Sequence, residues 1–245
     1  MADGSASVGG ALRAGLAEWR PALRTCWLAL LLAGVLGVAA GWAPPGGRLI
    51  AGLATAVIVQ GALYRRIFGR APGLKGLRWG ADEWRLLGAH LLVLCLIALI
   101  GAILLTVVGA VVLGVVRASA PGLDLGSAPA MRDALASAGL GGFVAALAAA
   151  AGLAILVWLS LRLSLTAPAT VAQGAVRVLS AFPLTRGRVP VLLAISLLLA
   201  APVLLVALVL GAAAAPFVSV TYLLLAPVWA GALAHVYRQA THPQD

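Results

Sequence analysis

The sequence predicts an all-α protein: a polytopic membrane helix bundle of six transmembrane helices with one short amphipathic interfacial helix. Of its 245 residues, 63% are hydrophobic, and the mean hydropathy is +1.09. Soluble domains are roughly 45–50% apolar. The excess cannot be buried in a water-soluble core of this size, so lipid must surround most of the surface. Apolar runs of about 20 residues, the length that crosses a hydrocarbon core of roughly 30 Å, recur along the chain.

Breaks in the apolar pattern divide the chain into six predicted spans. They occupy residues 22–42, 49–64, 86–116, 140–165, 189–210 and 217–237. Prolines and glycines at 43–47 end the first span, because proline lacks a backbone N–H and glycine weakens a helix. The third span would be about 46 Å long at 1.5 Å per residue, so it must tilt or project from the bilayer. Separation of the last two spans rests on a turn at 212–216.

The two sides of the predicted bundle differ in charge. Fourteen basic residues fall in the tails and loops of one side, and three (Arg48, Arg117 and Arg132) fall on the other. Loops rich in Lys and Arg stay in the cytoplasm, so we expect the tails 1–21 and 238–245 to be cytoplasmic. Frequent Ala, Gly and Arg without any Asn is typical of a GC-rich bacterial genome. The expected location is therefore the bacterial inner membrane.

The first span has an alternative interpretation as a signal peptide. Val38, Ala39 and Ala40 include small residues suited to cleavage. The apolar run before them is long for the hydrophobic part of a signal peptide, and 21 residues precede it. We therefore expect a retained span. Cleavage would remove this span without changing the orientation of the others.

The net charge of +10 favours the membrane surface as a partner. The basic residues lie between apolar runs, where anionic headgroups of the cytoplasmic leaflet attract them. The lipid bilayer is thus the predicted partner, and nucleic acid is not. All seven acidic residues lie outside the spans. Cation-coupled carriers usually keep an ionisable or oxygen-rich site near mid-membrane, so proton or sodium coupling is disfavoured.

Few residues could support catalysis. Asp82 and Glu83 are adjacent carboxylates, and adjacent residues on a helix do not face each other. We expect them to be a solvated pair or a helix N-terminal charge pair. Cys26 and Cys95 each lie in an apolar run and should be buried structural thiols. No catalytic residue is predicted.

Two histidines are weak candidates for metal or haem ligands. His90 and His235 lie near the same end of the third and sixth spans, and a pair at similar depth could clamp a metal or haem. They could equally be amphipathic interface residues. Because no third ligand or spacing motif accompanies them, we predict no cofactor.

The amphipathic helix is predicted within residues 167–188. Pro168 closes the fourth span and can begin a new helix, and Pro183 ends it. Apolar residues then share one helical face, with Gln173 and Arg177 on the other. Such a helix should lie in the cytoplasmic interface with Arg177 toward the headgroups.

The same region resembles a known family. Residues 162–168 read Arg-Leu-Ser-Leu-Thr-Ala-Pro, and residues 181–188 read Ala-Phe-Pro-Leu-Thr-Arg-Gly-Arg. This pattern is similar to the membrane domain of some glycerophosphoryl diester phosphodiesterases and their stand-alone relatives. Ala181 replaces the family's serine, Pro183 replaces a basic residue, and no aromatic follows Arg188. The catalytic domain is absent, so the resemblance implies a lipid-embedded six-helix domain without a known reaction.

Arginines and prolines supply the remaining candidate site residues. Arg162 lies between two leucines near the cytoplasmic end of the fourth span. It could snorkel to the headgroups, or face inward to bind a lipid phosphate or cap helix carbonyls. The other candidate lipid or ligand contacts are Arg177, Arg186 and Arg188. Pro202 and Pro227 lie near the midpoints of the last two spans. Kinks there could open a cavity, although membrane helices also tolerate proline without such a role.

The predicted function is that of a non-enzymatic inner-membrane protein. It would organise partners or lipids through the basic loops 65–85 and 167–188, as a homo-oligomer or with another membrane protein. The alternative is a small transporter or permease-like component for an uncharged or amphipathic substrate. A cavity lined by both proline-bearing helices would favour it. A membrane enzyme acting on lipid is a third hypothesis, and it would need His90, His235 and Arg162 to converge.

Overall fold

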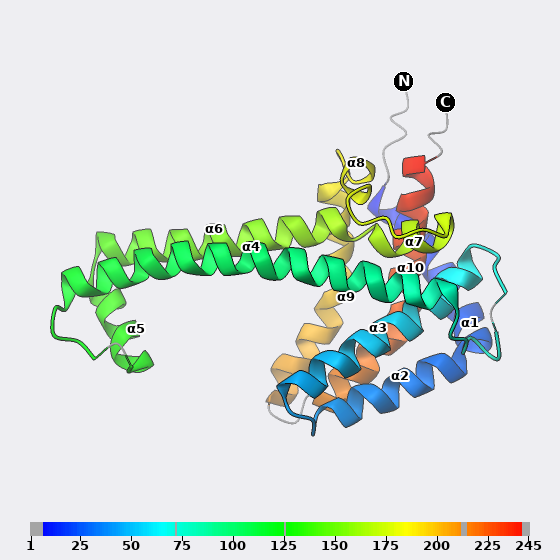
Figure 1. The fold of residues 1–245 in the computed structure, drawn as a ribbon, viewed down its shortest axis with the longest axis horizontal. Coiled ribbons are helices and arrows are strands. Elements are labelled where there is room, and N and C mark those ends of the chain that lie inside the picture. The colour runs from blue at the N-terminus through cyan, green and yellow to red at the C-terminus, as the bar shows by residue number, and fades with distance from the viewer. Residues whose placement is uncertain (1–6, 72, 125, 212–214, 242–245) are drawn as a thin grey trace. The chain divides into compact units, whose positions relative to one another are not determined.

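The structure is a computed structural model that describes residues 7–71, 73–124, 126–211 and 215–241. These residues are largely helical, with one isolated antiparallel bridge between Leu74 and Leu77. In chain order the helices are α1 (Val8–Thr25), α2 (Trp27–Ala40), α3 (Pro45–Ile67), α4 (Ala81–Ser119), α5 (Ala128–Ser137), α6 (Leu140–Leu163), α7 (Thr166–Gln173), α8 (Ala181–Leu184), α9 (Val189–Leu210) and α10 (Ala215–Thr241) (Figure 1).

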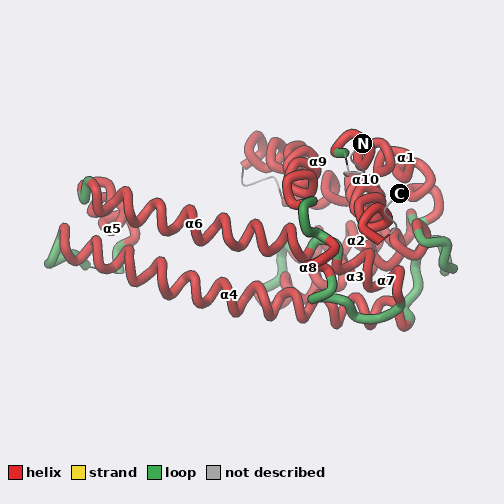
Figure 2. The backbone as a smooth tube through the Cα atoms, turned by 90° about the horizontal axis from the view of Figure 1, so that it is seen from above, coloured by secondary structure: helices red, strands yellow, loops and turns green. Residues whose placement is uncertain are grey.

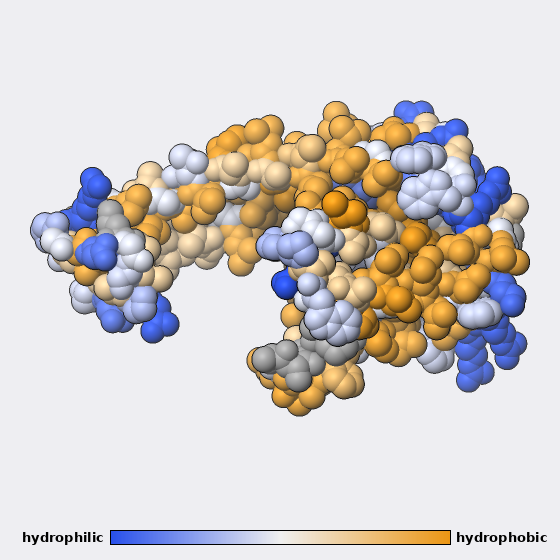
Figure 3. Space-filling model, turned by 60° about the horizontal axis from the view of Figure 1, so that its bottom comes forward, coloured by the Kyte–Doolittle hydropathy of each residue, from blue (hydrophilic) through white to orange (hydrophobic). Residues whose placement is uncertain are grey.

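The helices meet the requirements of a multi-pass membrane protein. Five helical segments among the described residues are long and apolar enough to cross a membrane, and α1 with α2 makes a sixth if this bent pair is one span. The prediction of an all-α membrane bundle is therefore confirmed. Apolar side chains cover much of the visible surface, and hydrophilic ones gather at its margins (Figure 3). That is the distribution expected where lipid is the solvent.

The chain forms two compact units. The first contains Met1–Val93 and Leu161–Asp245, and the second contains Leu94–Ser160. Helices α4 and α6 each contribute to both units. The α4 helix has 39 residues and extends beyond the predicted span 86–116 at both ends, which corresponds to about 58 Å of helix.

The predicted first span is divided at Cys26. α1 ends at Thr25, α2 begins at Trp27, and the two axes differ by 90°. Residues 8–21, which the sequence predicts as part of a tail, belong to α1. This helix buries a stripe of small residues and exposes its arginines, so it is amphipathic. α2 has 14 residues, about 21 Å, which is less than a hydrocarbon core.

Small residues bring α1 close to α10. A Cβ on Gly231 would lie 2.8 Å from Gly15 Cα, so the two backbones are nearly in contact. Trp19 Nε1 donates to the carbonyl of Leu224, 2.9 Å away. The paired positions run in opposite directions along the chain, so the helices are antiparallel. They lie side by side (Figure 2).

A helical hairpin joins α2 to α3. Arg48 closes the turn by donating to the carbonyls of Gly41 and Ala43, which lie just past the end of α2 where carbonyls lack helical partners. Pro45 begins α3, where a missing N–H costs nothing. The two helices lie side by side in Figure 1 and share a buried apolar core with α10.

α9 and α10 carry the interior prolines. α9 ends at Leu210 and α10 begins at Ala215, so they are separate helices; residues 212–214 of the predicted turn lie outside the described residues. Pro202 is exposed within α9, and Pro227 is buried within α10.

The predicted single amphipathic helix between 167 and 188 is wrong. The segment forms α7 and the short α8, with no helix between them. Gly174 ends α7 in the left-handed conformation at φ +64°, which glycine adopts without steric cost. The apolar spacing of this segment fitted one helix but could not show that Gly174 stops it.

In the second unit, α4 and α6 run antiparallel. A Cβ on Gly101 would meet Leu156 at 4.0 Å, and one on Gly152 would meet Val108 at 3.4 Å. The sequence predicts a loop between the spans 86–116 and 140–165, where the structure has α5. Ser127 caps this helix, since its hydroxyl accepts from the Ala130 N–H at 3.4 Å.

Candidate functional site: a buried ion-pair network at the basic end

Several segments of the first unit meet at one end. Arg238 Nη2 donates to the Ile67 carbonyl at 2.6 Å, which joins the ends of α10 and α3. Gln173 Nε2 donates to the Tyr237 hydroxyl at 3.1 Å, which adds the end of α7. Arg188 Nη2 donates to the Gln239 carbonyl at 3.0 Å, which adds the start of α9. We call this region, with the loop 68–80 between α3 and α4, the basic end.

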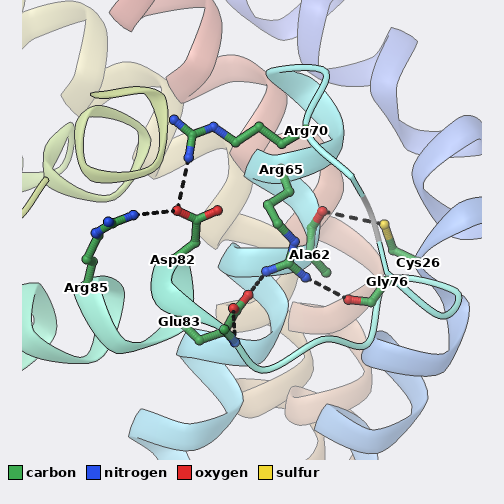
Figure 4. Close-up of polar contacts among 9 residues, drawn as sticks. Cys26, Ala62, Arg65, Arg70, Gly76, Asp82, Glu83 and Arg85 are labelled. Atoms are coloured by element: carbon green, nitrogen blue, oxygen red, sulfur yellow. Dashed lines mark hydrogen bonds and ion pairs between the residues drawn. The ribbon is translucent and has the colours of Figure 1, made fainter. Parts of the chain in front are cut away.

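A fully buried ion pair anchors the loop. Arg65, near the end of α3, pairs with Glu83, in the first turn of α4, and their side chains are 2% and 1% exposed. Arg65 Nη2 also donates to the Gly76 carbonyl at 3.0 Å. Glu83 Oε2 accepts the Gly80 N–H at 2.8 Å, as the acidic member of a helix capping box does. Figure 4 shows these groups converging beneath the loop.

Burying two charges is expensive unless they are paired and their remaining hydrogen-bonding groups are satisfied. Here the backbone of the loop supplies two of the partners, so the loop and the ion pair depend on each other. Glu83 was expected to be a solvated charge or a simple helix N-terminal charge. The position in the first turn of α4 is confirmed, but the solvated alternative is wrong for Glu83, because its carboxylate is buried against α3. The sequence signal was the opposite charge on the facing ends of two consecutive spans, Arg65-Arg66 and Asp82-Glu83.

Two glycines make room for the network. A Cβ on Gly61 would lie 2.6 Å from Glu83 Oε1. A Cβ on Gly76 would lie 2.7 Å from Cys26 Cα, and Gly76 has φ +87°, a conformation that side chains rarely adopt. Cys26 Sγ in turn donates to the Ala62 carbonyl at 3.7 Å (Figure 4). The bend between α1 and α2 is therefore packed directly against the loop.

Asp82 holds a second, half-buried group of charges. Its Oδ1 accepts from Arg70 Nη1 at 3.0 Å and from Arg85 Nη1 at 3.2 Å (Figure 4). Arg70 Nη2 also donates to the Ala172 carbonyl at 3.1 Å, which ties the loop to α7. Glu18 on α1 pairs with Arg66 on α3. All three acidic residues that the structure describes in the first unit are thus paired with arginines.

The outer surface of the basic end combines cations with tryptophans. Trp27, Trp79 and Trp84 are 42%, 48% and 62% exposed. The Lys75 ammonium lies 4.8 Å from the centre of the Trp27 ring, and Trp79 and Trp84 make an edge-to-face pair with centroids 5.5 Å apart. Exposed tryptophans beside basic residues are typical of the membrane–water interface. Nearby basic side chains that are exposed include Arg20, Arg24 and Arg78.

Two of the four arginines predicted as ligand contacts bond to neighbouring protein groups. The Arg162 guanidinium lies 5.3 Å from the centre of the Phe182 ring, and its carbonyl accepts from the Thr185 hydroxyl. Arg188 bonds to two carbonyls, those of Leu184 and Gln239. These two arginines hold α8 against its neighbours. Arg177 and Arg186 are exposed.

The structure gives local contacts for both candidate histidines and the burial of both cysteines. His90 Nδ1 lies 2.7 Å from the Leu86 carbonyl of its own helix. His235 lies against α1, where a Cβ on Gly10 would be 3.6 Å from its Nε2. In the described part of the chain, no three His, Cys, Asp or Glu side chains are placed to hold a metal ion. Cys26 is buried as predicted, whereas Cys95 is exposed on α4.

In comparisons with protein-family models, curated proteins and solved structures, nothing matches this chain. The resemblance of residues 162–188 to the phosphodiesterase-associated membrane domain stays a prediction. The network joins the loop to the ends of α3 and α7 and to the start of α4, and cations and tryptophans are exposed beside it.

Proposed function

We propose that this chain is a non-enzymatic, multi-pass protein of the bacterial inner membrane that binds anionic lipid headgroups through its basic end. By doing so it would organise lipids, or membrane proteins attracted to them. The basic end would face the cytoplasm, with both termini on that side. One observation carries the proposal: arginines neutralise the described carboxylates of the first unit, while further cations stay exposed beside interfacial tryptophans.

Electrostatics favours this function. A basic residue close to an anionic membrane surface contributes about 1 kcal/mol to membrane attraction. Because the described acids of this unit are consumed in ion pairs, they do not offset that attraction. The Trp side chains fix the depth of the surface at headgroup level. The loop is held by the buried pair of Arg65 and Glu83, so binding would not require its ordering.

Lipid retention tests the proposal. The purified protein is exchanged into mixed phosphatidylglycerol and phosphatidylcholine, and bound lipids are counted by native mass spectrometry. We expect preferential retention of phosphatidylglycerol. The variant Arg24→Gln/Lys75→Gln/Arg78→Gln should lose this preference about 100-fold, since three charges are worth about 3 kcal/mol at low salt.

A matched control removes charge elsewhere. Arg117→Gln/Arg132→Gln alters exposed basic residues of the second unit, and it should retain the lipid preference. Equal loss in both variants, or no preference in the wild type, would contradict the proposal. Orientation is tested separately with cysteines introduced at Arg20 and Arg48 in a Cys26→Ala/Cys95→Ala background. An impermeant maleimide added outside spheroplasts should label position 48 and not position 20.

A second candidate function has one observation in its favour. A cavity of about 200 Å³ is lined by Val203 of α9 and by Ser219 and Tyr222 of α10, the two helices with interior prolines. This arrangement favours a permease-like component for an uncharged or amphipathic solute. It predicts that reconstituted liposomes equilibrate a neutral solute faster than empty liposomes do. Equal rates would exclude this candidate.

A further inference from the structure

Two cavities meet at Tyr222 inside the first unit. One, of about 110 Å³, lies between α3, α10 and the segment around Ser164 and Ala167. The other, of about 200 Å³, is lined by residues of α2, α3, α9 and α10. Tyr222 lines both, so the two cavities adjoin at this side chain.

The lining of these cavities is uncharged and mixes apolar with polar side chains. Gln60, Tyr64, Ser164 and Trp229 line the smaller cavity with Tyr222. Thr55 and Ser219 line the larger one. In a bundle surrounded by lipid, polar groups need internal partners because no bulk water can supply them. Several hydrogen-bonding side chains around a hollow space therefore point to a polar occupant.

Two polar atoms on α3 are the main evidence for a polar occupant. Gln60 Oε1 and Thr55 Oγ1 are shielded from the surface, and neither forms a hydrogen bond with any group that the structure describes. Leaving a buried polar atom unpaired is costly. A side-chain amide can turn to present either its oxygen or its nitrogen. A hydroxyl group would satisfy both orientations, because it donates and accepts.

An apolar groove adjoins the larger cavity at Leu223. It encloses about 600 Å³ between α2 and α10 and is lined by apolar and tryptophan side chains, including Leu31, Val35 and Trp42. Leu223 lines both the groove and the larger cavity. A molecule with its polar group in the cavity can therefore leave an alkyl chain in the groove.

We propose that these adjoining spaces are a binding site for a neutral amphiphile that carries a hydroxyl headgroup. The hydroxyl bonds to Gln60 or Thr55 beside the Tyr222 ring, and the alkyl chain lies in the groove between α2 and α10. A charged headgroup is excluded because the lining holds no charged side chain to offset its desolvation. This site is separate from headgroup binding at the basic end and does not depend on it.

Photolabelling tests the site in the intact wild-type protein. Three probes share a ten-carbon chain with a diazirine: an alcohol, an alkane and a carboxylate. After irradiation in lipid nanodiscs, labelled peptides are mapped by mass spectrometry. The alcohol should label α2 and α10 around the groove, and unlabelled decanol should compete at least tenfold better than decane. Labelling spread evenly over the lipid-facing helices, or equal competition by decane, would overturn the proposal.

Variants then locate the headgroup. Gln60→Leu removes the unpaired amide, and Tyr222→Phe removes only a hydroxyl. Gln60→Leu should reduce alcohol labelling about tenfold and leave alkane labelling unchanged. The matched controls are Gln173→Leu and Tyr237→Phe, which alter the same residue types at the basic end and should label as the wild type does. Unchanged alcohol labelling in Gln60→Leu/Thr55→Val would also overturn the proposal.

Headgroup binding at the basic end and alcohol binding in the cavities can be tested independently. The Arg24→Gln/Lys75→Gln/Arg78→Gln variant should keep full alcohol labelling, and Gln60→Leu should keep its preference for phosphatidylglycerol. Loss of alcohol labelling in the basic-end variant would place the alcohol at the basic end and overturn the cavity site.

Discussion

Arg65 and Glu83 form an ion pair from which water is excluded, and the loop between them is held by the same two side chains. They lie on consecutive helices, and each also bonds to loop backbone, at Gly76 and Gly80. The pair therefore joins α3 to α4 in the protein interior and is not a surface salt bridge. The two side chains thereby join the described part of the glycine-rich loop to both helices.

Replacing one member of the Arg65–Glu83 pair should destabilise the protein far more than replacing both members. Arg65→Met or Glu83→Met leaves one charge buried and unpaired, which should cost about 3–5 kcal/mol of unfolding free energy. The double variant should be substantially more stable than the sum of these losses implies. Unfolding in mixed micelles, followed by tryptophan fluorescence, gives the unfolding free energies of the wild type, both single variants and the double variant. Additive losses would show that the two side chains are not coupled.

The effect of Gly61→Ala on the unfolding free energy should change sign when Arg65 and Glu83 are replaced. In the wild type its Cβ would lie 2.6 Å from Glu83 Oε1, so the substitution should be destabilising. In Arg65→Ala/Glu83→Ala the obstructing carboxylate is gone. There the better helix propensity of alanine should add up to about 1 kcal/mol. The same unfolding assay measures both, and destabilisation in both backgrounds would contradict the steric explanation.

Gly76→Ala should open the loop at Cys26. The substitution combines a left-handed backbone at φ +87° with a Cβ 2.7 Å from Cys26 Cα. Gly69→Ala is the matched control, because Gly69 has φ +68° with nothing within 4 Å of its Cβ position. Backbone strain of about 1–2 kcal/mol is common to both. Only Gly76→Ala should make the buried Cys26 thiol react with a maleimide, in a Cys95→Ala background.

The spans were predictable because lipid imposes a simple rule on composition. The predicted spans 189–210 and 217–237 coincide with α9 or lie within α10, and the span 49–64 lies within α3. A run of apolar residues reports length and burial in lipid. It does not report the direction of the helix axis, so the 90° bend at Cys26 could not be predicted from the run 22–42.

The candidate site was less predictable than the fold. Single arginines such as Arg162 were selected because they interrupt apolar runs, but the buried charge is at Arg65, in a pair of arginines that looked like an ordinary span end. Its partner Glu83 looked solvated. Recognising the pair needs the distance between two helix ends, which depends on the fold of the loop. The unpaired Gln60 likewise became informative only when a cavity was found beside it.

The contact between α1 and α10 should depend on having no side chain at Gly231. A Cβ there would lie 2.8 Å from Gly15 Cα and 3.1 Å from the Glu18 side chain, so Gly231→Ala should push α1 away and weaken the Trp19 bond to Leu224. We expect faster hydrogen exchange across α1, with smaller changes in α9. Gly9→Ala is the control within α1, since nothing lies within 4 Å of its Cβ position. It should slow exchange slightly, because alanine favours the helix. Unchanged α1 exchange in Gly231→Ala would mean that α1 is not held by this close approach.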